Sequence, residues 1–222
     1  MKTLAQNIKT KEFKSIYLLY GEEAFLKKSY KNQLRQAIVG DDTMNYHYFE
    51  GKGIDLKEII SLADTMPFFG EQRLIVIEDS GLFKSGGTEN LVEYLPQMPK
   101  TTCMVFVESE VDKRSRMYKK VKELGYPAEL KPQTERELKR WVLQLLTQEE
   151  IRLTEPVMDY FLMTTGTNMS LIAMKATPQV TAVKTVSMEP SLFGGMPRLI
   201  VLLEYSTATP IINLAKPSSR TA

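Results

Sequence analysis

The residues best suited to chemistry follow the first apolar segment of the chain. The segment Ile16–Tyr20 is a continuous apolar run, and the sequence GEEAFLKKS follows it from Gly21 to Ser29. A phosphate-binding loop, G-x-x-x-x-G-K-[ST], stands at this place between a buried strand and a helix. Gly21 and Lys27 match that motif. The segment therefore has the position of a nucleotide site, and its other residues decide whether it has the chemistry.

Two departures from the motif remove that chemistry. Leu26 stands at the second glycine position, so the backbone amides cannot curl freely around a phosphate. Lys28 stands where a hydroxyl should bind magnesium, and Glu22 and Glu23 add negative charge where a triphosphate would lie. Two interpretations stay open: an ordinary strand-to-helix turn, or a degenerate phosphate loop in a relative of ATPases. Neither favours ATP hydrolysis here, and we expect no bound cofactor.

Other residues with catalytic side chains are few. A catalytic triad or a multi-histidine metal site would have to be built around His47, the only histidine, which is better interpreted as a partly exposed strand residue. Cys103 is the only cysteine, so there is no disulfide framework and no thiolate zinc site. Glu78 and Asp79 resemble a Walker-B pair in reversed order, but an acidic strand end is the better interpretation. We predict no catalytic residue and no metal site.

A second candidate is the segment Met66–Gly70, which reads MPFFG. Pro67 biases the residue before it away from helical geometry, and Gly70 permits a sharp return into the next strand. Phe68 and Phe69 are thereby placed at a constrained loop tip, where soluble proteins usually have polar residues. Loop aromatics of this kind often anchor protein interfaces. On composition alone, the favoured alternative is that both rings fold back onto their own domain. We call Met66, Pro67, Phe68 and Phe69 the aromatic wedge.

Short apolar segments alternate with helical patterns from residue 16 to about residue 130. Such alternation predicts the α/β class, with a mostly parallel sheet and helices on both faces. We expect strands at Ile16–Tyr20, Asn45–Glu50, Arg73–Glu78, Thr102–Val107 and Tyr126–Leu130, the last of them an edge strand. We expect helices at Ala24–Val39, Asp55–Thr65, Leu91–Leu95 and Lys113–Leu124.

The pattern changes near Gln133. Thr134 and Glu137 have the spacing of a capping box, which predicts the start of a helix. Thr154 and Asn168 are candidate caps for two further helices. Consecutive helices without strands predict a small helical lid domain. Beyond residue 173 the density of proline breaks any long helix, and the tail fits no fold that the pattern indicates.

Length, net charge and the distribution of apolar residues limit the remaining functional classes. The chain of 222 residues is long enough for two domains, and its net charge of +2 does not indicate a general nucleic-acid coat. We interpret a local basic run as the solvated face of a helix rather than a DNA site. That run comprises Lys113, Arg114, Arg116, Lys119, Lys120 and Lys122. No apolar stretch is long enough to span a bilayer and the first residues lack the apolar core of a signal peptide, so we expect a cytoplasmic protein.

Three segments carry a further signal in their order and spacing. They are Tyr17–Glu23 with Leu26, Met66–Gly70 followed by Arg73–Ile77, and Leu130–Thr134 followed by Trp141. Together they resemble the delta subunit family of bacterial DNA polymerase III, over roughly residues 10 to 172 and again at 180–193. The resemblance implies an AAA+-like domain with a degenerate phosphate loop (Gly21, Leu26, Lys27, Lys28), then a helical lid and a helical collar.

The family's role implies what the aromatic wedge does. A delta subunit binds the ring-shaped sliding clamp and holds one interface open, and a hydrophobic pair on its first domain enters a pocket on the clamp. By position that pair is Phe68 and Phe69, with Met66 and Pro67 shaping the loop. The implied partners are the sliding clamp (beta subunit), the ATPase gamma/tau and delta-prime subunits of the loader, and primed DNA indirectly through the loader. No membrane partner is expected.

The resemblance also divides the chain. We expect an AAA+-like clamp-binding domain at residues 1–132, a partial helical lid at 133–193 and an unassigned tail at 194–222. A helix-length stretch of the lid is missing between Ala173 and Gln179, and after Phe193 the resemblance ends without a collar domain. We interpret the tail as a truncated or frame-disrupted reading, which affects assembly of the loader more than clamp binding.

The resemblance implies a clamp-opening subunit with no activity of its own, in a holoenzyme whose complex has DNA-directed DNA polymerase activity. Two alternatives belong to other classes. The first is an active P-loop ATPase or nucleotide kinase, which would bind ATP with magnesium. The second is a DNA-binding adaptor that uses the basic helix, whose binding would depend steeply on salt.

Overall fold

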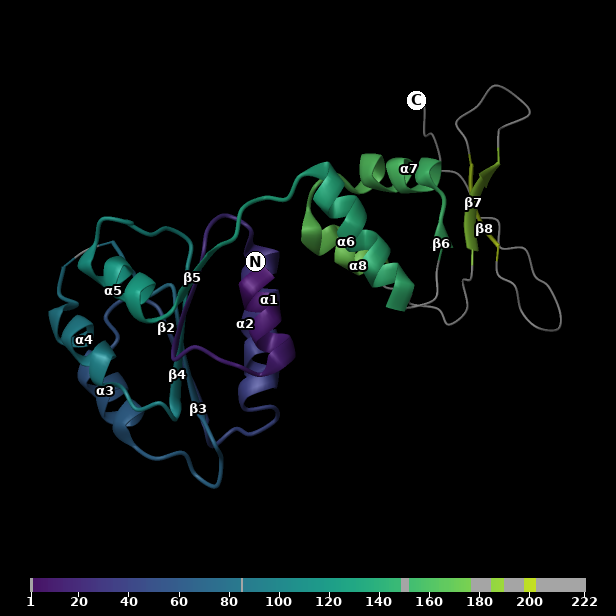
Figure 1. Ribbon diagram of the computed structural model, residues 1–222. Helices are drawn as coiled ribbons and strands as arrows, with labels where there is room; N and C mark the ends of the chain where they lie inside the picture. The colour runs from purple at the N-terminus through teal and green to yellow at the C-terminus, as the bar shows by residue number, and fades with distance from the viewer. Residues whose placement is uncertain (1, 85, 149–151, 177–184, 190–197, 203–222) are drawn as a thin grey trace, which may run out of the picture. The chain divides into compact units, whose positions relative to one another are not determined.

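The computed structural model describes residues 2–84, 86–148, 152–176, 185–189 and 198–202. The chain divides into two compact units, Met1–Pro132 and Gln133–Ala222 (Figure 1). The functional labels of these units, a clamp-binding domain and a lid, stay predictions.

The first unit is built on a five-stranded sheet with the order β2-β3-β4-β1-β5, in which all neighbouring strands run parallel. The strands are β1 (Ile16–Tyr20), β2 (Tyr46–Glu50), β3 (Arg73–Glu78), β4 (Thr102–Glu108) and β5 (Tyr126–Glu129). The three inner strands are buried along almost their whole length, which is why they read as continuous apolar runs. The predicted α/β class with a parallel sheet is confirmed, and β5 lies at an edge as expected.

Helices cover both faces of this sheet (Figure 1). The helices α1 (Lys2–Thr10) and α2 (Ala24–Ile38) lie on one face, and α3 (Leu56–Asp64), α4 (Glu89–Tyr94) and α5 (Arg116–Leu124) lie on the other. A 3-10 turn, Leu95–Gln97, continues α4. The first helix is absent from the sequence-based expectations, because Leu4 and Ile8 are its only large apolar residues. It is held by packing, since Leu4 is fully buried in the core under that face.

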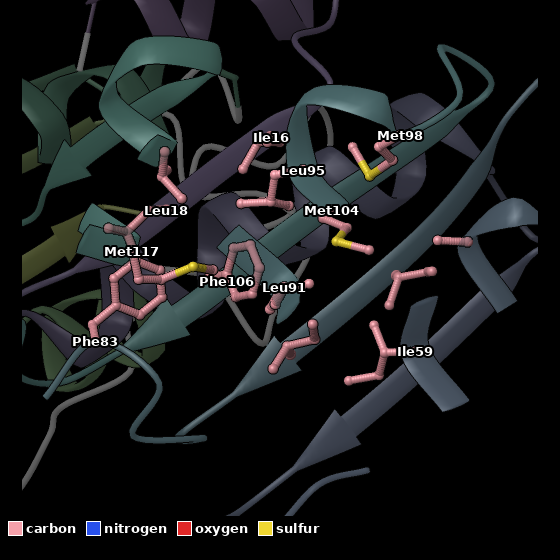
Figure 2. Close-up of a cluster of buried hydrophobic side chains, with 14 of the residues drawn as sticks. Ile16, Leu18, Ile59, Phe83, Leu91, Leu95, Met98, Met104, Phe106 and Met117 are labelled. Carbon is pink, nitrogen blue, oxygen red and sulfur yellow. The ribbon is translucent and has the colours of Figure 1, made fainter. Parts of the chain in front are cut away.

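The two faces of the sheet carry two separate cores, and alternate residues of each strand supply them. In β1, Ile16 and Leu18 point into the core beneath α3, α4 and α5, where Phe83 and Phe106 meet edge to face (Figure 2). Tyr17 and Leu19 point into the core beneath α1 and α2. Each large apolar side chain buried in this way stabilises the fold by about 1.5–3 kcal/mol. The sheet is therefore a stable platform for the loops at its ends.

The second unit contains helices and a small sheet. Its helices are α6 (Glu135–Gln148), α7 (Glu155–Thr165) and α8 (Met169–Ala176). Its strands are β6 (Arg152–Leu153), β7 (Thr185–Glu189) and β8 (Arg198–Leu202), in the order β6-β7-β8. The three expected helices are present; the two-residue strand β6 between α6 and α7 was not expected, and β7 and β8 lie beyond residue 173, where the sequence pattern indicates no fold. Strand β6 is short and pairs in parallel with β7, which is distant in the sequence, so no local pattern marks it; β7 and β8 are consecutive antiparallel strands.

The predicted helix starts can be compared with the caps. The capping box is confirmed, because the Thr134 N–H donates to Glu137 Oε2 over 2.8 Å and the Glu137 N–H donates to Thr134 Oγ1 over 3.4 Å. Asn168 Oδ1 accepts from the Leu171 N–H over 3.1 Å, also as predicted. Thr154 stands at the N-cap of α7, but its side chain makes no cap hydrogen bond.

Two sequence-based expectations fall largely outside the described residues. The missing stretch of the lid between Ala173 and Gln179 overlaps residues 177–184, and the tail after Phe193 is described only in β8. Among the helices that the structure describes, none is both long and apolar enough to cross a bilayer.

Candidate functional site

The aromatic wedge lies in the loop between α3 and β3, and its rings are presented to solvent. The Phe69 side chain is 97% exposed and that of Phe68 51% exposed. The two rings contact each other in a T-shaped pair, with centroids 4.5 Å apart and planes at 78°. Met66 is also exposed, whereas Pro67 is half-buried. The alternative in which both rings fold back onto their own domain is therefore excluded.

Arg73, the first residue of β3, holds the N-terminal side of the aromatic wedge. Its side chain is almost fully buried, and its Nη1 donates to the carbonyls of Leu62 and Thr65 over 2.6 and 2.7 Å. Nη2 donates to the carbonyl of Met66 over 2.9 Å. The last carbonyls of a helix have no partner within the helix and carry its negative dipole end. The guanidinium binds one such carbonyl, that of Leu62, together with two carbonyls just beyond α3, and so fixes the chain as it leaves the helix.

Asn45, the residue before β2, holds the other side. The Phe68 N–H donates to Asn45 Oδ1 over 2.7 Å, and Asn45 Nδ2 donates back to the Phe68 carbonyl over 2.8 Å. Nδ2 also donates to Asp42 Oδ2 over 2.6 Å, and this hydrogen bond is the main cause that lowers the pKa of the Asp42 carboxyl. Asn45 is 0% exposed. A buried amide whose nitrogen and oxygen are both hydrogen-bonded has one defined orientation.

The backbone of the aromatic wedge shows a specific constraint. Phe69 has a φ of +51°, in the left-handed region that costs a residue with a side chain about 1–2 kcal/mol. At Gly70, an added Cβ would lie 2.7 Å from Asn45 Nδ2, so only glycine fits without moving the anchor. Gly70 was expected to use its freedom to turn, but the positive φ of this loop is at Phe69 and not at Gly70, so the close approach to Asn45 is the reason for glycine here.

The loop from Gly21 to Lys28 follows the path of a phosphate loop between strand and helix, but its side chains contact other parts of the first unit. Gly21 has a φ of +120°, and a Cβ there would lie 2.4 Å from the Leu130 carbonyl oxygen. Glu23 caps α2 by accepting from the Phe25 N–H over 3.2 Å. Leu26 packs against the core beneath α1 and α2. The residue at the second glycine position thus contributes to folding rather than to a ring of amide donors.

Lys27, which matches the lysine of the motif, is buried and bonded within the unit. Its Nζ donates to Ser109 Oγ over 3.1 Å and to the Glu108 carbonyl over 3.4 Å, both at the end of β4. Ser109 Oγ in turn donates to Asp79 Oδ1 over 3.4 Å. The ammonium that would bind a phosphate in an active loop is therefore directed at the protein. Lys28 is exposed and offers no hydroxyl for magnesium.

The acidic pair after β3 is likewise engaged by neighbouring side chains. Glu78 forms an ion pair with Lys31 and accepts from the Tyr48 hydroxyl over 2.9 Å. The nearby Glu108 carboxylate accepts from Ser80 Oγ over 2.5 Å, and burial raises its pKa. These acidic groups satisfy protein donors, which agrees with an acidic strand end rather than a Walker-B pair.

A family model described as DNA polymerase III, delta subunit, matches residues 17–131 of the 222, just over half of the chain. The chain belongs to the DNA polymerase III delta subunit family. The match contains both the degenerate phosphate loop and the aromatic wedge of this delta-family chain.

Two further similarities accompany that match. The curated DNA polymerase III subunit delta of Bacillus subtilis (strain 168) is 26% identical over an alignment of 157 residues, and the match covers 65% of this chain and 45% of that protein. A solved structure described as the Bacillus subtilis DNA clamp loader delta protein (YqeN) has a TM-score of 0.67 at 21% identity, covering 79% of this chain and 55% of the other. This likeness confirms the AAA+-like fold. The delta-family chain spans about half the length of both.

His47 and Cys103, the only histidine and the only cysteine of the delta-family chain, are both partly or fully withdrawn from solvent. His47 is half-buried in β2; burial first, and then the positive charge of Arg73, lower its pKa. Cys103 is buried, which raises the pKa of its thiol to about 12. Within the described ranges, no group of three or more His, Cys, Asp or Glu residues is arranged to hold a metal ion.

Part of the basic run on and before α5 is neutralised by neighbours. Lys113 pairs with Glu129 over 3.1 Å, Arg114 with Asp112 over 3.1 Å and Lys120 with Glu123 over 2.8 Å. These surface pairs agree with the interpretation of a solvated helix face.

Two residues of the site were missed in the sequence analysis, Asn45 and Arg73, which appear there only as strand ends. A signal existed for Arg73, because an arginine that opens a fully apolar strand must find partners if it is buried. Nothing in the local sequence marks Asn45, whose partner Phe68 is 23 residues away.

Proposed function

We propose that this chain is the clamp-binding subunit of a DNA polymerase III clamp loader, which binds and opens the sliding clamp without hydrolysing ATP. The observation that carries the proposal is the exposed pair Phe68 and Phe69, held by buried anchors in a chain of the delta subunit family. An aromatic side chain buries about 150–250 Å² in a pocket, and a few such anchors supply most of the affinity of an interface.

Opening follows if the aromatic wedge binds one state of the clamp better than another. A ligand shifts a conformational equilibrium only by its differential affinity for the two states. The two rings would be buried more fully in a clamp whose interface is open or distorted, and binding would hold that state. No chemical step by this chain is required.

The nucleotide chemistry then belongs to other subunits. Lys27 is bonded to Ser109 and Leu26 packs in the core, which supports a chain without ATPase activity. The proposed partners are the sliding clamp, the gamma/tau ATPase and delta-prime subunits, and primed DNA through the loader. The proposed compartment is the cytoplasm, where bacterial replication takes place.

Calorimetry with the sliding clamp of the same host tests this proposal. Replacing both rings, Phe68→Ala with Phe69→Ala, is expected to weaken binding by more than about 2 kcal/mol while the melting temperature stays unchanged. The matched control is Met163→Ala with Met174→Ala, which removes two exposed apolar side chains from the second unit. Unchanged affinity in the double phenylalanine variant, or no binding by the original chain, would rule the mechanism out.

A further inference from the structure

We propose that Asn45 and Arg73 are positioning residues that hold the aromatic wedge ready for its partner before any partner arrives. This proposal rests on the proposed function for the identity of the partner. Its central claim, that the two buried side chains impose the wedge's conformation, can be tested on the free chain.

The two anchors belong to one rigid end of the sheet. Asn45 immediately precedes β2 and Arg73 begins β3, and the backbone joins them where the Leu74 N–H donates to the Asn45 carbonyl over 2.8 Å. Neighbouring strands of a packed sheet have little freedom to move against each other. A group bound by both anchors is therefore fixed relative to the first unit.

The two anchors form hydrogen bonds with the backbone of the wedge on either side of Pro67. Arg73 binds the carbonyl of Met66, and Asn45 binds both the N–H and the carbonyl of Phe68. Proline itself fixes its φ near −65°. Three consecutive residues thus have a defined backbone, and Phe69 follows them directly.

The exposed rings cannot impose this conformation themselves. Phe69 is almost fully exposed, so its ring adds little to the stability of the fold. Its backbone is nevertheless in the left-handed region, which is unfavourable for a residue with a side chain. Local strain of this kind persists only when the surrounding structure over-determines it, and it gathers at binding sites. The over-determining contacts here are those of Asn45 and Arg73.

A pre-ordered wedge has a direct effect on affinity. Ordering a loop and its side chains at the moment of binding reduces the affinity, and pre-organisation removes that cost. Loosening the anchors should therefore weaken partner binding although neither anchor contacts the partner. The loss should disappear when there is no aromatic wedge left to position.

Three variants of the full chain and one control test the proposal. Asn45→Ala removes both side-chain hydrogen bonds to the backbone of Phe68. Asn45→Asp keeps an acceptor for the Phe68 N–H but loses the donor to the Phe68 carbonyl. Arg73→Lys keeps the charge but cannot reach the same set of carbonyls with a planar fork. Asn7→Ala is the matched control, because Asn7 is another buried amide and its partner Tyr17 is in β1, which β4 separates from β3. If Asn45→Ala does not fold, Asn45→Asp and Arg73→Lys take its place.

The first readout needs no partner. Amide hydrogen exchange at Phe68 should accelerate by about tenfold or more in Asn45→Ala, which removes the acceptor of that N–H, and by less in Asn45→Asp, which keeps it, while the β3 and β4 amides keep their protection. In Asn7→Ala the exchange at Phe68 should stay as in the original chain. Unchanged exchange at Phe68 in the Asn45 variants, or equal acceleration in Asn7→Ala, overturns the proposal.

The second readout is clamp affinity in a double-mutant cycle. Asn45→Ala should weaken binding about tenfold in the original chain and less than about twofold when Phe68→Ala and Phe69→Ala are already present. An equal loss in both backgrounds would show that Asn45 acts elsewhere and contradict the proposal. If the original chain does not bind the clamp, the proposed function fails, and the exchange experiment alone decides whether the anchors position the wedge.

Discussion

The side-chain amide of Asn45 pairs with both backbone polar groups of Phe68, at 2.7 Å to the N–H and 2.8 Å to the carbonyl. In a sheet, a neighbouring strand would supply these two hydrogen bonds. A side chain from the start of β2 supplies them here, so a loop residue has the backbone order of a strand residue while its ring points to solvent. This arrangement combines a fixed backbone with an exposed ring, as an interface anchor requires.

The conformation of Phe69 predicts that a glycine at this position gives a more stable chain than an alanine. Because the ring is exposed and φ is +51°, Phe69→Gly should be more stable than Phe69→Ala by about 1 kcal/mol, as only glycine adopts this backbone without strain. Urea unfolding measures the difference. Met66 is exposed without a positive φ, so the control pair Met66→Gly and Met66→Ala should show the opposite order, since glycine loses more entropy on folding. The same order at both positions would contradict the strain assigned to Phe69.

Gly70 should not tolerate a side chain. A Cβ at this position would meet Asn45 Nδ2 at 2.7 Å and Asp42 Oδ2 at 3.6 Å, so Gly70→Ala must displace the anchor. We expect a loss of stability of about 1–3 kcal/mol and faster amide exchange at Phe68. Gly86→Ala is the control, because an added Cβ there meets nothing within 4 Å. A Gly70→Ala chain with the stability and exchange of the Gly86→Ala chain would show that the close approach is not maintained in solution.

The state of the degenerate phosphate loop predicts the response to ATP. Since Lys27 is bonded to Ser109 and Glu108, magnesium and ATP should leave the melting temperature unchanged. An active site saturated at about one hundred times its dissociation constant would add about 2.7 kcal/mol of stability, which differential scanning calorimetry detects readily. A rise in melting temperature that Lys27→Met abolishes would favour the ATPase or kinase alternative.

His47 predicts a pH dependence of stability. Burial, followed by the charge of Arg73, lowers its pKa below the ordinary value of 6.5, while a backbone hydrogen bond with Met44 acts in the opposite direction. Its Nε2 is buried without a hydrogen-bond partner in the part of the chain that the structure describes. The folded state thus favours the neutral ring, so this contribution to stability is complete above pH 6.5 and is lost as the pH falls toward the lower folded value.

This prediction can be checked directly because the chain has a single histidine. An NMR titration of the folded chain should give a pKa below 6.5 for His47. Unfolding free energies at pH 7.5 and pH 5.5 should fall more for the original chain than for His47→Gln. A titration at or above the ordinary value would be inconsistent with the burial of the ring.

The sequence by itself determined the α/β class, the strand positions and the loop that carries the wedge, whereas composition alone favoured rings folded back onto the domain. Arg73–Glu78 is a strand over the whole predicted span because a continuous apolar run of that length is recognisable locally. Pro67 and Gly70 likewise act on the backbone of their immediate neighbours, so the loop between helix and strand was predictable. The family followed from the order of these local features.

The tertiary structure alone decided how the wedge is held and which groups the Lys27 ammonium binds. Asn45 meets Phe68 across 23 residues, and Lys27 meets Ser109 across 82. The helix α1 and the pairing of β6 with β7 depend equally on distant partners. Local sequence sets backbone preference and apolar periodicity, whereas contacts between distant segments depend on strand register and packing, which exist only once the chain has folded.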